Sequence, residues 1–207
     1  MENGEKESHG AHAQLRSDAQ RNRDNILAAA VLAFAKDANA SLEGIARVAG
    51  VGIGTLYRHY PTREALVEAA YRNEIKKLCD EAPKLLATHR PDIALAHFLD
   101  RFIDHMQTKP GMIEALRALI AAGNATPLNQ SLAMIAAAVA PILELGKAER
   151  VLRNDVSVDD FIAVKGAIAT ARPERARRLA TILIDGLRYG AHARSGRKAK
   201  RTAPRPR

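Results

Sequence analysis

Between residues 41 and 60, the apolar positions follow two short helical repeats with a break between them. Leu42, Ile45, Ala46 and Ala49 stand at offsets 0, 3, 4 and 7, the apolar stripe of a short amphipathic helix. Ser41 precedes the stripe, where its hydroxyl would accept a hydrogen bond from a free amide of the first turn. The pattern therefore predicts a helix that begins near residue 42.

The break at residues 49–51, Ala-Gly-Val, combines a small residue, a residue free to adopt positive φ, and an apolar residue. These properties suit a tight turn between two helices that meet at a steep angle. A second helix is predicted over residues 53–60, with Ile53, Leu56 and Tyr60 directed inward. Its remaining positions are rich in hydrogen-bond donors, which suits insertion into the major groove of DNA.

The rest of the chain also shows helical patterns. Apolar positions at Ile26, Ala30, Ala33 and Phe34 predict a helix over residues 22–37. Proline, glycine and capping residues then divide the chain into further amphipathic helices. These are expected over residues 62–80, 91–109, 112–122, 126–145, 158–171 and 173–190. The fold class predicted from this pattern is all-α.

Composition agrees with a helical core and with an intracellular setting. Hydrophobic residues make up 47% of the 207 residues but aromatic residues only 4%, so the core is built from Ala, Leu, Ile and Val. The single cysteine, Cys79, excludes an internal disulfide and fits a reducing cytoplasm. No signal peptide is recognisable, and the longest apolar run, residues 132–143, is too short to cross a bilayer. We therefore expect a cytoplasmic protein without membrane contact.

Most of the positive charge lies at the C-terminus. Residues 194–207 carry seven Arg or Lys residues and no acid, which accounts for +7 of the net charge of +9. We expect a disordered basic tail over residues 193–207, which either contacts DNA phosphates or only keeps the chain soluble. Residues 1–18 are expected to form a flexible polar arm. Arg16, Arg21 and Arg23 either contact DNA or lie in solvent at the start of a helix.

The segment around residues 41–60 resembles the DNA-binding motif of the TetR family. The family pattern T-x-x-x-I-A-x-x-A-G-V-S-x-G-T-L-Y-x-H-F aligns without a gap, and the resemblance covers residues 22–80. The matching positions are Ser41, Ile45, Ala46, Ala49, Gly50, Val51, Gly54, Thr55, Leu56, Tyr57, His59 and Tyr60.

Two positions depart from the family pattern. Gly52 stands where the family has a serine or threonine cap, and glycine costs only a few tenths of a kcal/mol relative to serine at such a position. Arg63 replaces the usual lysine, which keeps the positive charge and adds two-pronged donation to a phosphate. Neither departure removes the expectation of DNA binding.

The resemblance implies a three-helix helix-turn-helix head over residues 19–80 and a larger helical domain over residues 81–192 for ligand binding and dimerisation. Thr55 and Arg58 are expected to read base edges, and Gly54 to let the backbone approach DNA. Tyr57, His59 and Arg63, together with Ser41, are expected to contact phosphates. Glu43 either accepts from a cytosine or complements the helix dipole. The full predicted DNA-binding set is Ser41, Glu43, Gly52, Ile53, Gly54, Thr55, Tyr57, Arg58, His59 and Arg63.

The resemblance further implies a repressor that a small molecule, expected to be apolar, releases from a palindromic operator. Candidate residues for lining the ligand site are Leu99, Phe102, Ile103, Met106, Leu116, Ile120 and Met134. The last two helices are expected to form a homodimer interface, the alternative being packing within one chain. A second hypothesis is a ligand-independent dimeric DNA-binding protein whose C-terminal half only dimerises.

Catalytic chemistry has no positive signal in the sequence. Neither a Gly-rich phosphate loop after a strand nor a nucleophile motif is recognisable. His97 and Asp104 share a helix face opposite the apolar one, which is typical of a solvated surface. We therefore expect no enzyme activity, no cofactor and no metal site.

Overall fold

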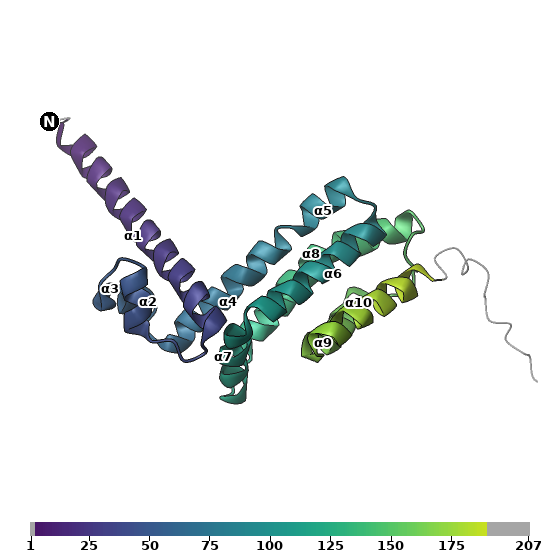
Figure 1. Ribbon diagram of the computed structural model, residues 1–207. Coiled ribbons are helices and arrows are strands. Elements are labelled where there is room, and N and C mark those ends of the chain that lie inside the picture. The colour runs from purple at the N-terminus through teal and green to yellow at the C-terminus, as the bar shows by residue number, and fades with distance from the viewer. Residues whose placement is uncertain (1–2, 190–207) are drawn as a thin grey trace, which may run out of the picture. The chain divides into compact units, whose positions relative to one another are not determined.

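The structure is a computed structural model that describes residues 3–189, and every regular element in that range is an α-helix (Figure 1). The predicted all-α class is confirmed. The expected basic tail, residues 193–207, lies outside the described residues. The helices are α1 (Asn3–Lys36), α2 (Leu42–Val48), α3 (Ile53–His59), α4 (Arg63–Cys79), α5 (Ala82–Thr88), α6 (Pro91–Thr108), α7 (Pro110–Ala121), α8 (Thr126–Ala148), α9 (Val158–Thr170) and α10 (Pro173–Arg188).

The chain forms two compact units. Among the described residues, the first comprises residues 3–80 and 104–135, and the second comprises residues 81–103 and 136–189. The expected boundary between residues 80 and 81 is also a boundary of these units. Residues 104–135, which were expected in the second domain, instead pack in the first unit. The head therefore has more supporting structure than its motif alone indicates.

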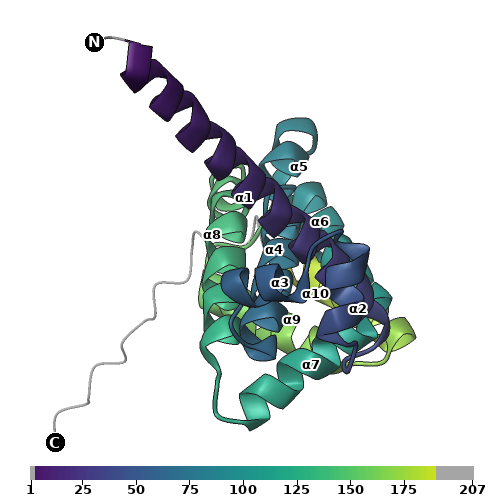
Figure 2. The ribbon, with the colours of Figure 1, turned by 90° about the vertical axis from the view of Figure 1, so that its left-hand side faces the viewer.

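In the first unit, α1, α4 and α7 contact one another, and α2 and α3 attach to α1 (Figure 2). Ile26, Ala30 and Phe34, which the pattern placed inward, are fully buried. Gly111 brings the first turn of α7 directly against the end of α1. A Cβ at this glycine would lie 2.5 Å from the carbonyl oxygen of Phe34.

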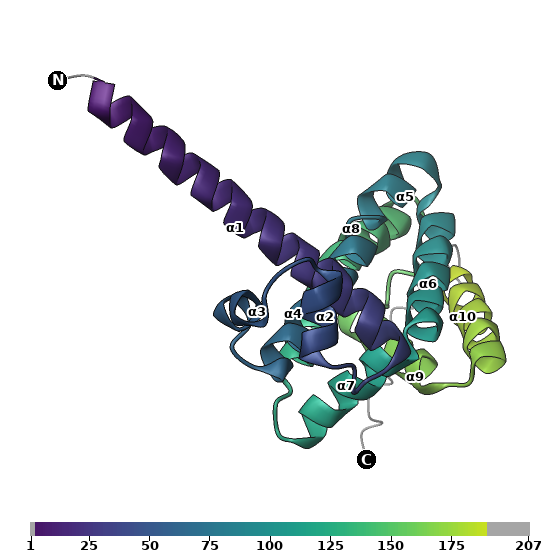
Figure 3. The ribbon, with the colours of Figure 1, turned by 60° about the vertical axis from the view of Figure 1, so that its left-hand side comes forward.

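Helix α1 is longer than predicted. It begins at Asn3 instead of near residue 22, and its N-terminal half extends past α2 and α3 (Figure 3). The backbone of residues 3–18, where a polar arm was expected, is helical. Periodicity could not reveal this segment because it has no apolar face, whereas its Ala, Glu, Lys, Gln and Arg residues favour helix and no proline interrupts it.

In the second unit, α9 and α10 contact each other, and the apolar face of α6 is buried. The buried Asp92 at the start of α6 accepts from the Nε of Arg188 at the end of α10, 2.9 Å away. Helix α5, which the sequence analysis did not anticipate, carries Pro83 in its first turn, where a missing amide hydrogen is tolerated.

Helix α8 has the length and composition of a membrane-spanning helix. It contains 23 residues, and its most apolar stretch of 18 residues has a mean hydropathy of 1.5 and is 33% buried within the described residues. One such helix is weak evidence for a membrane span, because core helices of soluble proteins have the same composition. Ser131 lies on its buried side and donates to the carbonyl of Pro127 at 2.8 Å.

Candidate nucleic-acid interface

The first helix of the predicted motif begins and ends as the sequence indicated. Ser41 Oγ caps α2 by accepting from the amide of Gly44 at 3.0 Å. Gly50 adopts a φ of +70°, and the amides of Gly50 and Val51 donate back to Arg47 and Ala46 at 3.2 and 3.0 Å. This pair of hydrogen bonds is the Schellman motif, which satisfies the last carbonyls of α2 and turns the chain into α3.

Helix α3 is held by one apolar side and leaves the other side free. Leu56 is fully buried and Tyr60 is 4% exposed, as predicted. Ile53, which the pattern placed inward, is 37% exposed at the first position of α3, so that expectation is corrected. Ile53 lies outside the buried side because the head needs only one turn of α3 to anchor it.

The predicted reading residues lie on this free side or beside it. Gly52, Gly54, Tyr57 and Arg58 are exposed, while Thr55 and His59 are half-buried. Helix α3 has no acidic residue, and its last turn carries Arg58 and His59. On α2, the exposed Glu43 stands in the first turn, where it complements the helix dipole. The arrangement offers donors to the negative and acceptor-rich surface of a nucleic acid.

The two glycines at the start of α3 have no structural reason within the head. A Cβ at Gly52 or at Gly54 would meet no atom within 4 Å, and neither glycine has a positive φ. Gly52 is the N-cap of α3, where glycine is well tolerated, whereas Gly54 lies inside the helix, where glycine is about 1 kcal/mol less favourable than alanine. Packing within the head therefore does not require glycine at either position.

Arg63 differs from the other predicted phosphate contacts. Its guanidinium donates to the carbonyls of Ala38 and Ala40 and lies 5.2 Å from the centre of the Phe34 ring. These groups belong to the end of α1 and to the connection between α1 and α2. The geometry favours an internal role for Arg63, and a phosphate contact by this residue stays a prediction.

A buried polar cluster in the first unit was not anticipated. Glu74 on α4 accepts from Lys77 at 2.7 Å and pairs with Lys109 at 3.2 Å. Burial alone would raise the pKa of Glu74, but hydrogen bonds and charges from both lysines outweigh it and lower this pKa. Lys77 lies at the helical i,i+3 spacing from Glu74, but Lys109 is 35 residues away, so no spacing rule reveals that partner.

His105 adjoins this cluster. Its Nδ1 lies 3.5 Å from the ammonium of Lys109, and its buried Nε2 has no hydrogen-bond partner among the described residues. Burial, followed by the positive charge of Lys109, lowers the pKa of His105 to about 4, although Glu74 opposes the shift. The ring is therefore neutral at neutral pH.

The predicted ligand-lining residues are divided between the two units. Leu99, Phe102 and Ile103 are buried in the second unit, and Leu116 is buried in the first. Met106, Ile120 and Met134 are half-buried in the first unit. None of these residues lines either of the two pockets described next, so their role in ligand binding stays a prediction.

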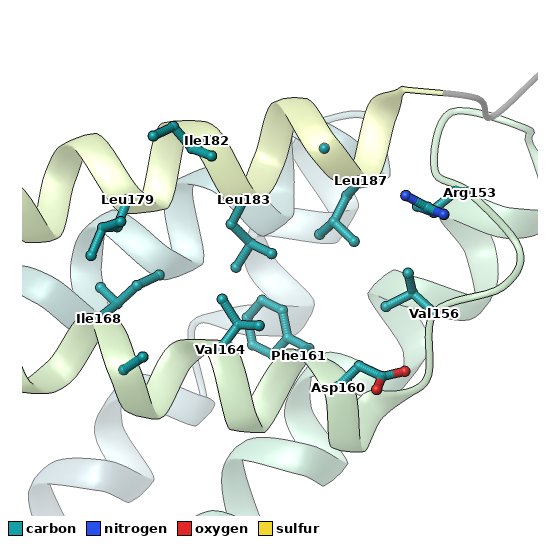
Figure 4. Close-up of a pocket in the computed structure, with 12 residues that line it drawn as sticks. Arg153, Val156, Asp160, Phe161, Val164, Ile168, Leu179, Ile182, Leu183 and Leu187 are labelled. Atoms are coloured by element: carbon teal, nitrogen blue, oxygen red, sulfur yellow. The ribbon is translucent and has the colours of Figure 1, made fainter.

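One pocket is a groove of about 380 Å³ along α9 and α10 (Figure 4). Phe161 and Leu187 form buried parts of its wall, whereas Val164 and Ile182 are 42% and 56% exposed. Arg153 and Asp160 stand among the lining residues at one end. The last two helices thus carry an apolar surface that residues 3–189 leave uncovered, in the place where a dimer interface was expected.

The other pocket, of about 220 Å³, lies in the first unit between the α1–α2 connection, the start of α4 and α7. Ala38, Asn39 and Arg63 line it on one side, and Ala115 and Leu119 on the other. Sequence patterns did not indicate this pocket, because its walls come from three separated segments.

Two family models match the chain. Residues 26–70 match the model described as bacterial regulatory proteins, tetR family. Residues 90–189 match the model described as transcriptional regulator SbtR-like, C-terminal domain. The first match contains the whole helix-turn-helix, and the second covers α9 and α10, which carry the apolar groove.

Solved structures with similar sequences have the same fold. The TetR transcriptional regulator SCO0520 from Streptomyces coelicolor is 46% identical, with a TM-score of 0.64, and the match covers 80% of this chain and 98% of that one. A TetR transcription regulatory protein from Mycobacterium vanbaalenii is 31% identical, with a TM-score of 0.63, over 84% of this chain and 99% of that one.

A curated relative is more distant. The HTH-type transcriptional regulator UidR of Escherichia coli (strain K12) is 28% identical over 108 residues. The match covers 51% of this chain and 52% of the relative, so the chain spans about half the length of that protein.

Proposed function

Because this chain belongs to the TetR family of DNA-binding transcriptional regulators, we propose that it is a repressor that binds a palindromic operator as a homodimer and is released by a small ligand. Its relatives are transcription factors, and we propose no catalytic activity and no cofactor for this chain. We place its action in the cytoplasm, where operators are accessible.

The observation that carries DNA reading is the free side of α3. This side presents donors and two glycines and has no carboxylate, while the opposite side anchors α3 through Leu56 and the following Tyr60. We assign Thr55 and Arg58 to base edges, since arginine donates in a two-pronged manner to guanine. Gly52 and Gly54, with Ile53 beside them, would allow the backbone of α3 to approach the groove.

Phosphate contacts would fix the orientation of α3. Tyr57 and His59 flank Arg58 and carry donors suited to phosphate oxygens. Ser41 Oγ accepts the capping hydrogen bond of α2, which leaves its own hydroxyl hydrogen available to a phosphate. Glu43 would accept from a cytosine amino group if the first turn of α2 reaches the groove.

The groove along α9 and α10 supports dimerisation through these two helices. A recognition helix of seven residues reads few base pairs, so two copies related by a two-fold axis are needed for selectivity. The exposed Val164 and Ile182 would be covered by the same helices of the partner.

Release from the operator by a ligand is the more specific part of the proposal, and the resemblance to ligand-responsive members of the family supports it. A ligand that binds one of two arrangements more tightly shifts their populations by its differential affinity. The second candidate is a ligand-independent DNA-binding dimer, which the apolar groove favours equally. Thermal stabilisation of the protein by a compound that also weakens DNA binding would favour ligand control.

The test is selection of random double-stranded DNA by the purified full chain, beside a chain that ends at residue 192. A shared palindromic motif is the expected result, and Arg58→Ala should relax the selection at one position of each half-site. Enrichment without a motif, or only with the basic tail present, would contradict sequence-specific reading by α3.

A further inference from the structure

Arg63 directs its guanidinium into the head. Nη1 donates to the carbonyl oxygen of Ala40 at 2.7 Å, and Nη2 donates to the carbonyl oxygen of Ala38. Its Cζ lies over the fully buried ring of Phe34, 5.2 Å from the ring centre. The carbonyls are 23 and 25 residues away in sequence, so the contact joins the first turn of α4 to the α1–α2 connection.

These contacts depend on the shape of arginine. The planar guanidinium can donate to two carbonyls and stack on an aromatic ring at the same time. A lysine ammonium would keep the charge but could not satisfy both carbonyls from one plane. The replacement of the family lysine by Arg63 therefore changes what this position can do.

The segment that Arg63 holds leads directly into α2. Residues 37–40 end at Ser41, which caps α2, and the Asp37 carboxylate accepts from the amide of Asn39 at 2.8 Å. On its other side the segment meets Gly111 of α7, where a Cβ would lie 2.9 Å from the amides of Asp37 and Ala38. The segment is thus held between α4 and α7.

We propose that Arg63 is a positioning residue, which fixes α2 and hence the reading helix α3 through residues 37–40, instead of contacting a DNA phosphate. The proposal rests on the function proposed above, because the effect of this positioning is measured on DNA binding. It reverses the role that the family resemblance implies for this position.

The experiment compares Arg63→Lys and Arg63→Gln with the full-length parent on the selected DNA site and on random DNA of equal length. Lys36→Gln is the control, because it removes a charge from the exposed end of α1. Affinity is measured at several salt concentrations, at a temperature where circular dichroism shows each variant to be folded.

The expected result is that Arg63→Lys and Arg63→Gln lose specific affinity by a similar factor, at least about ten-fold, with little loss on random DNA. For both variants the salt dependence should equal that of the parent. If Arg63 contacted a phosphate, its loss would weaken the salt dependence. The slope of log affinity against log salt concentration would then fall by about 0.9 per lost contact, or about 1.8 for a dimer. Parent-like affinity of Arg63→Lys, or a reduced slope of Arg63→Gln, would overturn the proposal.

Hydrogen exchange in the protein without DNA gives a second readout. The amides of Ala40, Gly44 and Ile45, which bond to Asp37 and Ser41, should exchange faster in Arg63→Lys than in the parent. Exchange in α9 should be unchanged. Equal exchange at all three amides would overturn the proposal even if the parent selected no DNA motif, an outcome that would contradict the proposed function separately.

Discussion

The carboxylate of Glu74 lies 3.2 Å from the ammonium of Lys109, with the two side chains only 8% and 20% exposed. Glu74 belongs to α4, and Lys109 is the residue that precedes the first turn of α7. The pair therefore joins two of the helices that support the reading head. Lys77 contacts the other oxygen of Glu74 at 2.7 Å, so the carboxylate keeps one partner if Lys109 is lost.

Replacing Lys109 by Met should lower the free energy of unfolding by about 2 kcal/mol. Breaking a buried ion pair costs about 3–5 kcal/mol, and the remaining Lys77 reduces this loss. Urea denaturation measures the change. The double variant Glu74→Gln with Lys109→Met should lose less than the sum of the single losses, because the partners are coupled. Strict additivity would show that they do not interact.

His105 should make stability depend on pH in the mildly acidic range. Its pKa of about 4 in the folded protein is below the ordinary 6.5, so the unfolded chain binds the proton first as pH falls. The stabilisation that neutral His105 contributes is complete well above pH 6.5 and is lost progressively toward pH 4. Between pH 7 and 5 the unfolding free energy should fall by about 2 kcal/mol from this group, because the slope approaches roughly 1.36 kcal/mol per pH unit between the two pKa values.

The control for this pH dependence is His105→Gln, which cannot take up the proton. Chemical denaturation of parent and variant at pH 7, 6 and 5 cancels the contributions of all other groups. As pH falls from 7 to 5, the parent should lose about 2 kcal/mol of stability relative to the variant. Parallel curves would mean that His105 is protonated equally in the folded and unfolded chains.

Gly54→Ala should separate folding from DNA binding. The new methyl group meets no atom of the head, so stability should be unchanged or rise by about 0.5–1 kcal/mol through helix propensity. Affinity for the selected DNA should fall at least about ten-fold, because the methyl group would occupy space needed for close approach. Gly166→Ala, at an equally open site in α9, should leave binding intact. Undiminished affinity of Gly54→Ala would remove this residue from the interface.

Ile182→Glu should convert the proposed dimer into monomers. In a symmetric dimer each copy would bring one glutamate into the apolar groove. A cost of about 2 kcal/mol for each of the two charges corresponds to a loss of roughly 1,000-fold in dimer affinity. Sedimentation velocity across a concentration series measures the change. Leu32→Glu, at an exposed aliphatic residue of α1, should not alter the oligomeric state. A dimer of parent-like affinity in Ile182→Glu would place the interface elsewhere.

The local parts of the fold were predictable because their signals lie within a few residues. The helices predicted over residues 158–171 and 173–190 begin at those positions, because Ser157 and Asp160 form the capping box of α9 and Pro173 opens α10. Gly50 likewise adopts the positive φ that the turn before α3 requires.

The remaining features depend on residues that are distant in sequence. The inward direction of Arg63 follows from two carbonyls and a ring that α1 places beside it, and no pattern near residue 63 contains that information. The expected inward position of Ile53 came from periodicity, which cannot show how much of a seven-residue helix the head covers. Helix α1 begins at Asn3, before the predicted start at residue 22, because its first residues favour helix. They have no apolar repeat from which this start could be predicted.

The contact at Gly111 limits how the protein can be divided. Because the first turn of α7 rests on the carbonyl of Phe34 with no room for a side chain, α7 forms part of the foundation of the head. A fragment that stops after α4 would leave the faces of α1 and α4 that meet α7 open to water. The DNA-binding head is therefore not a domain that can be transferred alone. A hybrid regulator built from it must also include residues 104–135.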